Sequence, residues 1–176
     1  MSDKKKYVIV HAYDPNHPGR VLLVEKDRPA WQKGCLNLLG GKVEQGETEL
    51  ETALRELKEE SGLKLKTTKD KEHQHQEVKL MGAIVTDVAV VYCVSLPVDS
   101  TLKLKPRKGE TEVAAWYDWD VVKSDKRLIP NLLCIIPLSR SGVTGWFVNG
   151  TAVGDGVYDV TVRLLLDHPI PHKPEE

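Results

Sequence analysis

The sequence predicts an α/β (α+β) fold, a sandwich of strands and helices around one core. Short apolar runs with the character of strands occupy much of the chain, and a strongly amphipathic helix at residues 48–62 interrupts them. A double glycine stands shortly before this helix. The 176 residues suffice for one domain with a proper core, so we expect residues 1–176 to form a single domain.

The first strands are predicted from alternation and from turn residues. Residues 7–13 alternate as a strand does, and residues 14–19 contain prolines, an asparagine and a glycine, which favour a turn. Residues 21–26 form a second apolar run, so we expect the two strands to pair as a hairpin. After a loop at 28–33, residues 36–39 are predicted to form another short strand.

Residues 48–62 carry the signals of both ends of a helix. Thr48 followed three positions later by Glu51 is a capping-box pattern, and Gly62 suits a C-terminal cap. At about 100° per residue, four apolar side chains share one stripe that should face the core: Leu50, Ala53, Leu54 and Leu57.

The second half of the chain is predicted to complete the sandwich. Residues 66–77 are polar and indicate an exposed loop or a strand edge. We then expect a long central strand at 79–96, a loop at 99–111, a strand at 113–119, a helix opening at 119–124, an apolar helical run broken by prolines at 128–138, and a β-hairpin extension at 145–166. The tail at 168–176 is expected to be loose.

The predicted helix carries three carboxylates on one face, Glu56, Glu59 and Glu60. Like charges at these spacings repel, and a divalent cation that takes oxygen ligands would neutralise them. Arg55 lies four positions before Glu59 and can pair with it. Taken alone, the glutamates favour the solvated face of a surface helix. The preceding Gly40 and Gly41 favour a site, because adjacent glycines let the backbone turn sharply beside a ligand.

This segment resembles the Nudix box, the signature of the Nudix hydrolase superfamily. Its nine defined positions within residues 41–63 are all filled: Gly41, Glu47, Arg55, Glu56, Leu57, Glu59, Glu60, Gly62 and Leu63. One departure is Leu39, where many members carry proline before the double glycine. The resemblance implies the Nudix fold, a mixed β-sheet sandwiched between helices, and hydrolysis of a nucleoside diphosphate linked to another group, with Mg²⁺ or Mn²⁺ as cofactor.

The resemblance also implies roles for individual residues. Glu59 and Glu60 are the first expected metal ligands, and the Gly41 carbonyl is a further one. Glu56 is either another ligand or the general base that deprotonates the attacking water. Four further residues have supporting or alternative roles: Glu47 through the metal shell, Arg55 as an orienting residue, and Glu110 or Glu112 as a base outside the box, unless these last two are solvated loop charges.

Clues to the substrate are fewer. The glycines at 40 and 41 would let the backbone approach the substrate. Arg28, in the loop at 28–33 before the third strand, can reach phosphates, although such residues are usually just solvated. Trp116 can stack on a base, but core packing is the commoner role of such a residue. The resemblance to some purine-nucleotide members implies that Asn131 could read a base edge, although a turn or helix-capping role is the commoner one.

The expected activity is therefore a Mg²⁺-dependent pyrophosphatase acting on a nucleoside triphosphate or another nucleotide derivative. The alternatives are a hydrolase of ADP-ribose, nucleotide sugars or dinucleotide polyphosphates, and a non-catalytic ligand sensor. Sensors typically lose box glutamates, and this chain keeps all of them.

Composition limits the partners and the compartment. With 25 basic against 26 acidic residues, the chain shows no basic surplus for a nucleic-acid polymer. Three cysteines without a Cys-x-x-Cys pair fit a reducing cytoplasm. Neither a signal peptide nor a membrane span is expected. A homodimer is compatible with the resemblance.

Overall fold

A mixed sheet of six strands forms the larger layer of the fold, within the part of the chain that the computed structural model describes, residues 4–65, 78–153 and 157–164. Its strands, in spatial order, are β4 (Leu39–Lys42), β1 (Lys5–Tyr13), β6 (Ala89–Pro97), β5 (Lys79–Val85), β8 (Trp146–Val153) and β9 (Val157–Leu164). β1 pairs parallel with β6 and antiparallel with β4, so the sheet is mixed as expected. The predicted loop at 66–77 and the tail at 168–176 lie outside the described residues.

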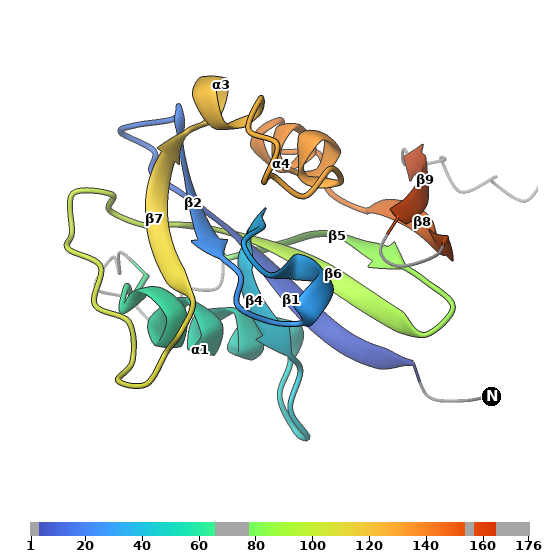
Figure 1. Cartoon of the computed structure of the whole chain (residues 1–176), viewed down its shortest axis with the longest axis horizontal. Helices are drawn as coiled ribbons and strands as arrows, with labels where there is room; N and C mark the ends of the chain where they lie inside the picture. The colour runs from blue at the N-terminus through green and yellow to red at the C-terminus, as the bar shows by residue number, and fades with distance from the viewer. Residues whose placement is uncertain (1–3, 66–77, 154–156, 165–176) are drawn as a thin grey trace, which may run out of the picture.

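A smaller antiparallel sheet holds β3 (Leu36–Asn37), β2 (Arg20–Glu25) and β7 (Val113–Asp118) in that order. Helix α1 (Glu49–Ser61) and helix α4 (Leu132–Arg140) lie on opposite sides of the strands, with the short helix α3 (Trp119–Val122) near α4 (Figure 1). This arrangement confirms the α/β (α+β) fold class. No helix among the described residues is long and apolar enough to cross a membrane.

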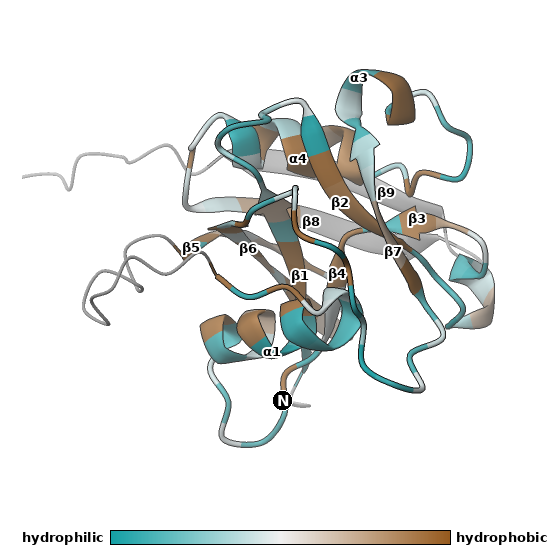
Figure 2. Ribbon diagram, turned by 90° about the vertical axis from the view of Figure 1, so that its left-hand side faces the viewer, coloured by the Kyte–Doolittle hydropathy of each residue, from teal (hydrophilic) through white to brown (hydrophobic). Residues whose placement is uncertain are grey.

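Two clusters of buried side chains form the core, and Figure 2 shows the apolar colouring that strands such as β1 and β2 contribute to it. Alternation along β2 divides its residues between the clusters. Leu22 and Val24 pack toward α1, whereas Val21 and Leu23 pack toward α4. The three-stranded sheet therefore separates an α1-side cluster from an α4-side cluster.

Helix α1 has the predicted ends. The Thr48 hydroxyl accepts the backbone N–H of Glu51 at 3.2 Å, and the Glu51 carboxylate accepts the backbone N–H of Thr48 at 2.8 Å, so the capping box is confirmed. Gly62 closes the helix in the left-handed conformation, at φ 73°. Ala53 and Leu57 are completely buried, as the apolar stripe requires.

Three predictions about strands are wrong. β1 and β2 belong to different sheets and do not form a hairpin, because β1 already has β4 and β6 as neighbours. The long strand at 79–96 is two strands, β5 and β6, joined by a turn without glycine or proline that Thr86 stabilises through its hydrogen bonds with Ala89. The strand at 36–39 is also divided, because β3 and β4 join different sheets.

The remaining expected elements are present with small shifts. α3 begins at Trp119, and the proline-containing run forms α4 with Pro137 inside the helix. The C-terminal extension is a hairpin, since β8 and β9 pair antiparallel from Trp146↔Leu164 to Val153↔Val157.

Candidate active site

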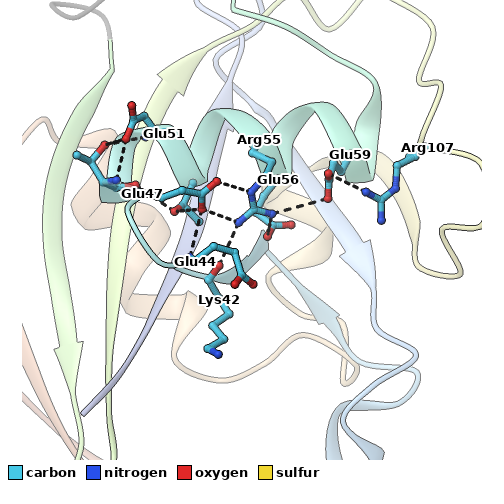
Figure 3. A network of polar contacts seen from close by, with 10 residues as sticks. Lys42, Glu44, Glu47, Glu51, Arg55, Glu56, Glu59 and Arg107 are labelled. Carbon is cyan, nitrogen blue, oxygen red and sulfur yellow. Dashed lines mark hydrogen bonds and ion pairs between the residues drawn. The ribbon is translucent and has the colours of Figure 1, made fainter. Parts of the chain in front are cut away.

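The polar side chains of the signature segment gather where β4 leads into α1 (Figure 3). The double glycine was expected in a tight loop between strand and helix. Gly40 and Gly41 instead lie within β4, paired with Ile9 and Val8 of β1. Gly41 is needed there because the Glu56 carboxylate lies against its backbone, and Gly40 because a β-carbon would meet the backbone of β1.

Arg55 is the centre of this network. Its guanidinium donates to both carboxylate oxygens of Glu47, at 2.8 and 2.9 Å, and to Oε1 of Glu56 at 2.6 Å. It also donates to the carbonyl oxygen of Lys42 at 3.1 Å. The expected pair with Glu59 is present, but at 3.7 Å it is the longest of these contacts. Hydrogen bonds from Arg55 lower the pKa of Glu47 to about 2, so this carboxylate is ionised at neutral pH.

Glu56 lies against Gly41. A β-carbon added at Gly41 would be 2.1 Å from Oε1 of Glu56, so another residue at this position would displace the carboxylate. Burial raises the pKa of Glu56, and the adjacent Arg55 guanidinium opposes this rise. Glycine at 41 thus gives a helix carboxylate access to the strand backbone.

Glu60 lies one turn further along α1 and contacts the neighbouring glycine. The backbone N–H of Gly40 donates to its Oε2 at 2.9 Å. Gly40 has φ 152°, and a β-carbon there would be 2.0 Å from the carbonyl oxygen of Val8, so only glycine fits. Burial raises the pKa of Glu60 to about 8, although the charge of Lys26 and the Gly40 hydrogen bond oppose the rise.

Glu112 reaches the same region from the other sheet. It stands just before β7, is only 4 % exposed, and accepts a hydrogen bond from the ammonium of Lys26. Lys26 Nζ also lies 3.9 Å from Oε1 of Glu60. Sequence reasoning considered Glu112 but missed Lys26. The available signal was a cation immediately after the apolar strand at 21–25, but its acidic partner is 86 positions away.

Glu59 and Glu110 lie further out. The Glu59 carboxylate is partly exposed and accepts a hydrogen bond from Arg107 at 2.8 Å, while the backbone N–H of Arg107 donates to the Glu59 carbonyl at 2.7 Å. Glu110 is half-buried, and its carboxylate accepts the backbone N–H groups of Thr111 and Glu112 within its own turn. Of the two glutamates before β7, Glu112 is the one that shares a cation with α1.

Hard divalent cations prefer oxygen ligands. The site supplies such oxygens, because glutamate carboxylates lie beside the backbone of Gly40 and Gly41, which have no side chains of their own. Within the described ranges, however, no three Asp, Glu, His or Cys side chains are grouped closely enough to hold an ion. Existing ion pairs explain this, because Arg55, Arg107 and Lys26 each hold one or more of the carboxylates. The residues fit a metal, but some of the ion pairs would have to open.

The expected substrate residues lie in three places. Arg28 is exposed in the loop before a 3-10 turn at Ala30–Gln32. Trp116 lies on β7, opposite Leu22 of β2; it is half-buried and packs into the α1-side cluster. Asn131 precedes α4, its side chain does not cap the helix, and its buried Oδ1 has no hydrogen-bond partner among the described residues. The structure does not bring Trp116 and Asn131 together, because they lie on opposite sides of the three-stranded sheet.

Comparisons with known proteins show the family to which the chain belongs. Residues 4–137 match the NUDIX domain family. The chain is 30 % identical over 131 residues to a protein of Danio rerio named oxidized purine nucleoside triphosphate hydrolase, covering 74 % of this chain and 79 % of that protein.

Solved structures share the fold. A MutT protein from Bacillus halodurans superposes with a TM-score of 0.66 at 17 % identity, covering 90 % of this chain and 97 % of that one. A NUDIX hydrolase from Nitrosomonas europaea gives 0.60 at 17 % identity, covering 86 % and 80 %. With the signature residues arranged between β4 and α1 as described, the chain belongs to the NUDIX family and is a hydrolase.

Proposed function

We propose that the protein is a Mg²⁺-dependent pyrophosphatase that cleaves the diphosphate linkage of a nucleoside triphosphate by attack of water. The observation that carries the proposal is that three buried carboxylates lie close together, with Glu56 and Glu60 of α1 against Gly41 and Gly40, and Glu112 before β7 joined to Glu60 through Lys26. The name of the Danio rerio relative supports a nucleoside triphosphate as the substrate class.

In this proposal the metal, Mg²⁺ or Mn²⁺, is held by Glu56, Glu59, Glu60 and the Gly41 carbonyl. When bound, it would withdraw charge from the phosphate oxygens and lower the pKa of water. Arg55 orients Glu56 and, more weakly, Glu59, and Glu47 keeps Arg55 in place through the two hydrogen bonds between them. Support of this kind for a ligand is a common requirement of metal sites.

Glu112 is the base that we assign, with one of its carboxylate oxygens taking the proton of the attacking water. Glu56 suits a ligand better than a base, because its carboxylate lies against the backbone of Gly41, whose carbonyl is the other expected ligand. Glu110 is less suitable, because its carboxylate is engaged by backbone N–H groups of its own turn. A base needs a proton-accepting oxygen that faces the reacting water.

For the substrate, we assign Asn131 to the base and Arg28 to the phosphates. A buried amide oxygen without a partner is costly, and a hydrogen-bond donor on a purine edge would satisfy it. Trp116 lies away from Asn131, so any contact of Trp116 with the substrate would be separate from base reading. The free thiols of Cys35, Cys93 and Cys134 suit a reducing cytoplasm, where we place the protein.

The test is a phosphate-release screen in Mg²⁺ with ordinary and oxidised nucleoside triphosphates, ADP-ribose, nucleotide sugars and dinucleotide polyphosphates. We expect pyrophosphate release from a triphosphate. Glu59→Gln should lower turnover by more than about 100-fold, the upper end for residues that only support a ligand. Glu49→Gln, in the first turn of the same helix, is the matched control.

Two outcomes of this screen would contradict the proposal. Cleavage of ADP-ribose or a nucleotide sugar in preference to every triphosphate would reject the substrate class. Near-normal turnover by Glu59→Gln would reject the assignment of the metal ligands.

A further inference from the structure

Lys26 is fixed at an unusual place for a lysine. Its backbone is bonded on both sides, because its N–H donates to the Cys35 carbonyl and its carbonyl accepts the Gly34 N–H, each at 2.8 Å. The side chain is only 12 % exposed, and its ammonium lies between a carboxylate of helix α1 and one that stands just before β7. It donates to Glu112 and lies 3.9 Å from Glu60.

The charge of Lys26 has a specific use at this position. Glu60 and Glu112 are 6 % and 4 % exposed, and a buried carboxylate without a counter-charge strongly destabilises a fold. Arg55 neutralises Glu56 but has no ion pair with either of these two carboxylates. Among the described residues, Lys26 is the one side-chain cation in ion-pair contact with Glu60 and with Glu112.

The chemistry of lysine also differs from that of the neighbouring arginines. Arg55 contacts Glu47 and Glu56 with several donors in a fixed plane, whereas a lysine ammonium is a compact point charge on a flexible stem. A point charge between two carboxylates resembles a bound cation in charge and position. Such a group can withdraw without dismantling the network around Arg55.

We propose that Lys26 is a positioning residue that serves as an internal counter-cation for Glu60 and Glu112 in the metal-free protein and releases them when a divalent cation binds. This inference rests on the proposed metal site. It predicts an effect on metal affinity that an ordinary structural ion pair would not have. Removing Lys26 should weaken the metal-free fold and at the same time strengthen metal binding, because a competing positive charge is lost.

The experiment measures Mn²⁺ binding by titration calorimetry, without nucleotide, on the full chain. We expect Lys26→Met to bind Mn²⁺ about tenfold or more tightly than the wild type, since nearby like charges cost this much at the effective dielectric of a protein surface. In EDTA the variant should have a lower melting temperature, and saturating Mn²⁺ should raise it by more than it raises that of the wild type.

Two variants serve as comparisons. Lys33→Met removes an exposed lysine from the same loop region, whose ammonium pairs with Asp27 at 3.4 Å, and it should leave Mn²⁺ affinity unchanged. Lys26→Arg keeps the charge and should return the Mn²⁺ affinity toward the wild-type value, whatever it does to packing.

The possible failures are distinguishable. If the wild type binds Mn²⁺ and Lys26→Met binds it equally or more weakly, Lys26 is an ordinary structural ion pair and the inference is wrong while the proposed function stands. If none of the proteins binds Mn²⁺ or cleaves a nucleotide, the proposed function is wrong, and so is the inference that a metal ion replaces Lys26.

Discussion

Two buried carboxylates, Asp14 at the end of β1 and Glu60 on α1, differ in the number of hydrogen-bond donors around them. Both are almost fully buried. Asp14 accepts four hydrogen bonds, from the Asn16 N–H, from His17 Nδ1, and from the N–H and hydroxyl of Ser100. Glu60 accepts one from a backbone N–H and has an ammonium 3.9 Å away.

The two pKa values move in opposite directions for this reason. Burial alone would raise the pKa of Asp14, but its four donors outweigh burial and hold the value well below the usual range. At Glu60 burial prevails, and the pKa rises to about 8. A carboxylate with a full set of donors stabilises the chain, whereas one with too few donors is suited to receive another cation.

The largest expected effect is a loss of turnover when Glu60, the carboxylate with few hydrogen-bond donors, is replaced. Glu60→Gln should lower the rate of nucleotide cleavage by more than about 100-fold, because a neutral amide is a poor ligand for a hard cation. The free energy of unfolding in EDTA should not fall, since the amide oxygen can still accept the Gly40 N–H. A clear loss of stability, measured by urea unfolding, would show that Glu60 is a structural residue like Asp14.

The two glycines of β4 should separate stability from activity. Gly40→Ala places a β-carbon against the Val8 carbonyl at an unfavourable φ and should lower the free energy of unfolding by about 3 kcal/mol or more. Gly41→Ala meets the end of the Glu56 side chain rather than backbone, so the fold should lose less than about 1 kcal/mol while turnover falls because the carboxylate is displaced. Equal losses of stability would contradict this difference. Urea unfolding and turnover assays of both variants measure it.

Asp14→Asn should have the reverse profile of Glu60→Gln. We expect about 2 kcal/mol less stability, since hydrogen bonds to a charged group contribute this order of free energy, and turnover within about twofold of the wild type. Urea unfolding with a parallel activity assay tests both parts. A large loss of turnover without loss of stability would assign Asp14 to the reaction.

The effect of Asp14 should also depend on pH. Its folded pKa is depressed, so its contribution to stability is complete above the ordinary aspartate pKa of about 4 and is lost as the pH falls through the lower folded value. The difference in unfolding free energy between wild type and Asp14→Asn should therefore shrink between about pH 5 and pH 2. A difference independent of pH would mean that the charge is not what the four donors stabilise.

The smallest effect is expected at the outer edge of the site. Arg107 is 64 % exposed, and its ion pair with Glu59 should contribute less than about 0.5 kcal/mol to stability. Arg107→Ala should lower turnover by less than about threefold, because Arg55 still lies beside Glu59. A loss comparable with that of Glu60→Gln would show that Glu59 depends on Arg107 for its position.

Sequence predictions were correct for interactions between residues close in the sequence and failed for interactions between residues far apart in it. The ends of α1 were correct because Thr48, Glu51 and Gly62 act within one or two turns. The hairpin of β1 and β2 was wrong because strand pairing depends on partners far along the chain.

The same limit applied to the site. Its α1 residues were predictable from their spacing, whereas the pairing of Lys26 with Glu112 joins positions 86 residues apart and leaves no local pattern. The turn between β5 and β6 was missed because Thr86, rather than a glycine or proline, stabilises it.

The division of the chain between two sheets has a mechanical consequence. Lys26 and Glu112 stand beside strands of the three-stranded sheet, and Gly40 lies in the six-stranded one. The positions of the proposed catalytic groups relative to one another therefore depend on the packing of the α1-side cluster, which contains both Leu22 of the smaller sheet and Leu57 of α1. We expect a substitution that expands this cluster to misalign the proposed catalytic groups before it unfolds the protein. Turnover should therefore respond to changes in core packing at this site before the free energy of unfolding does.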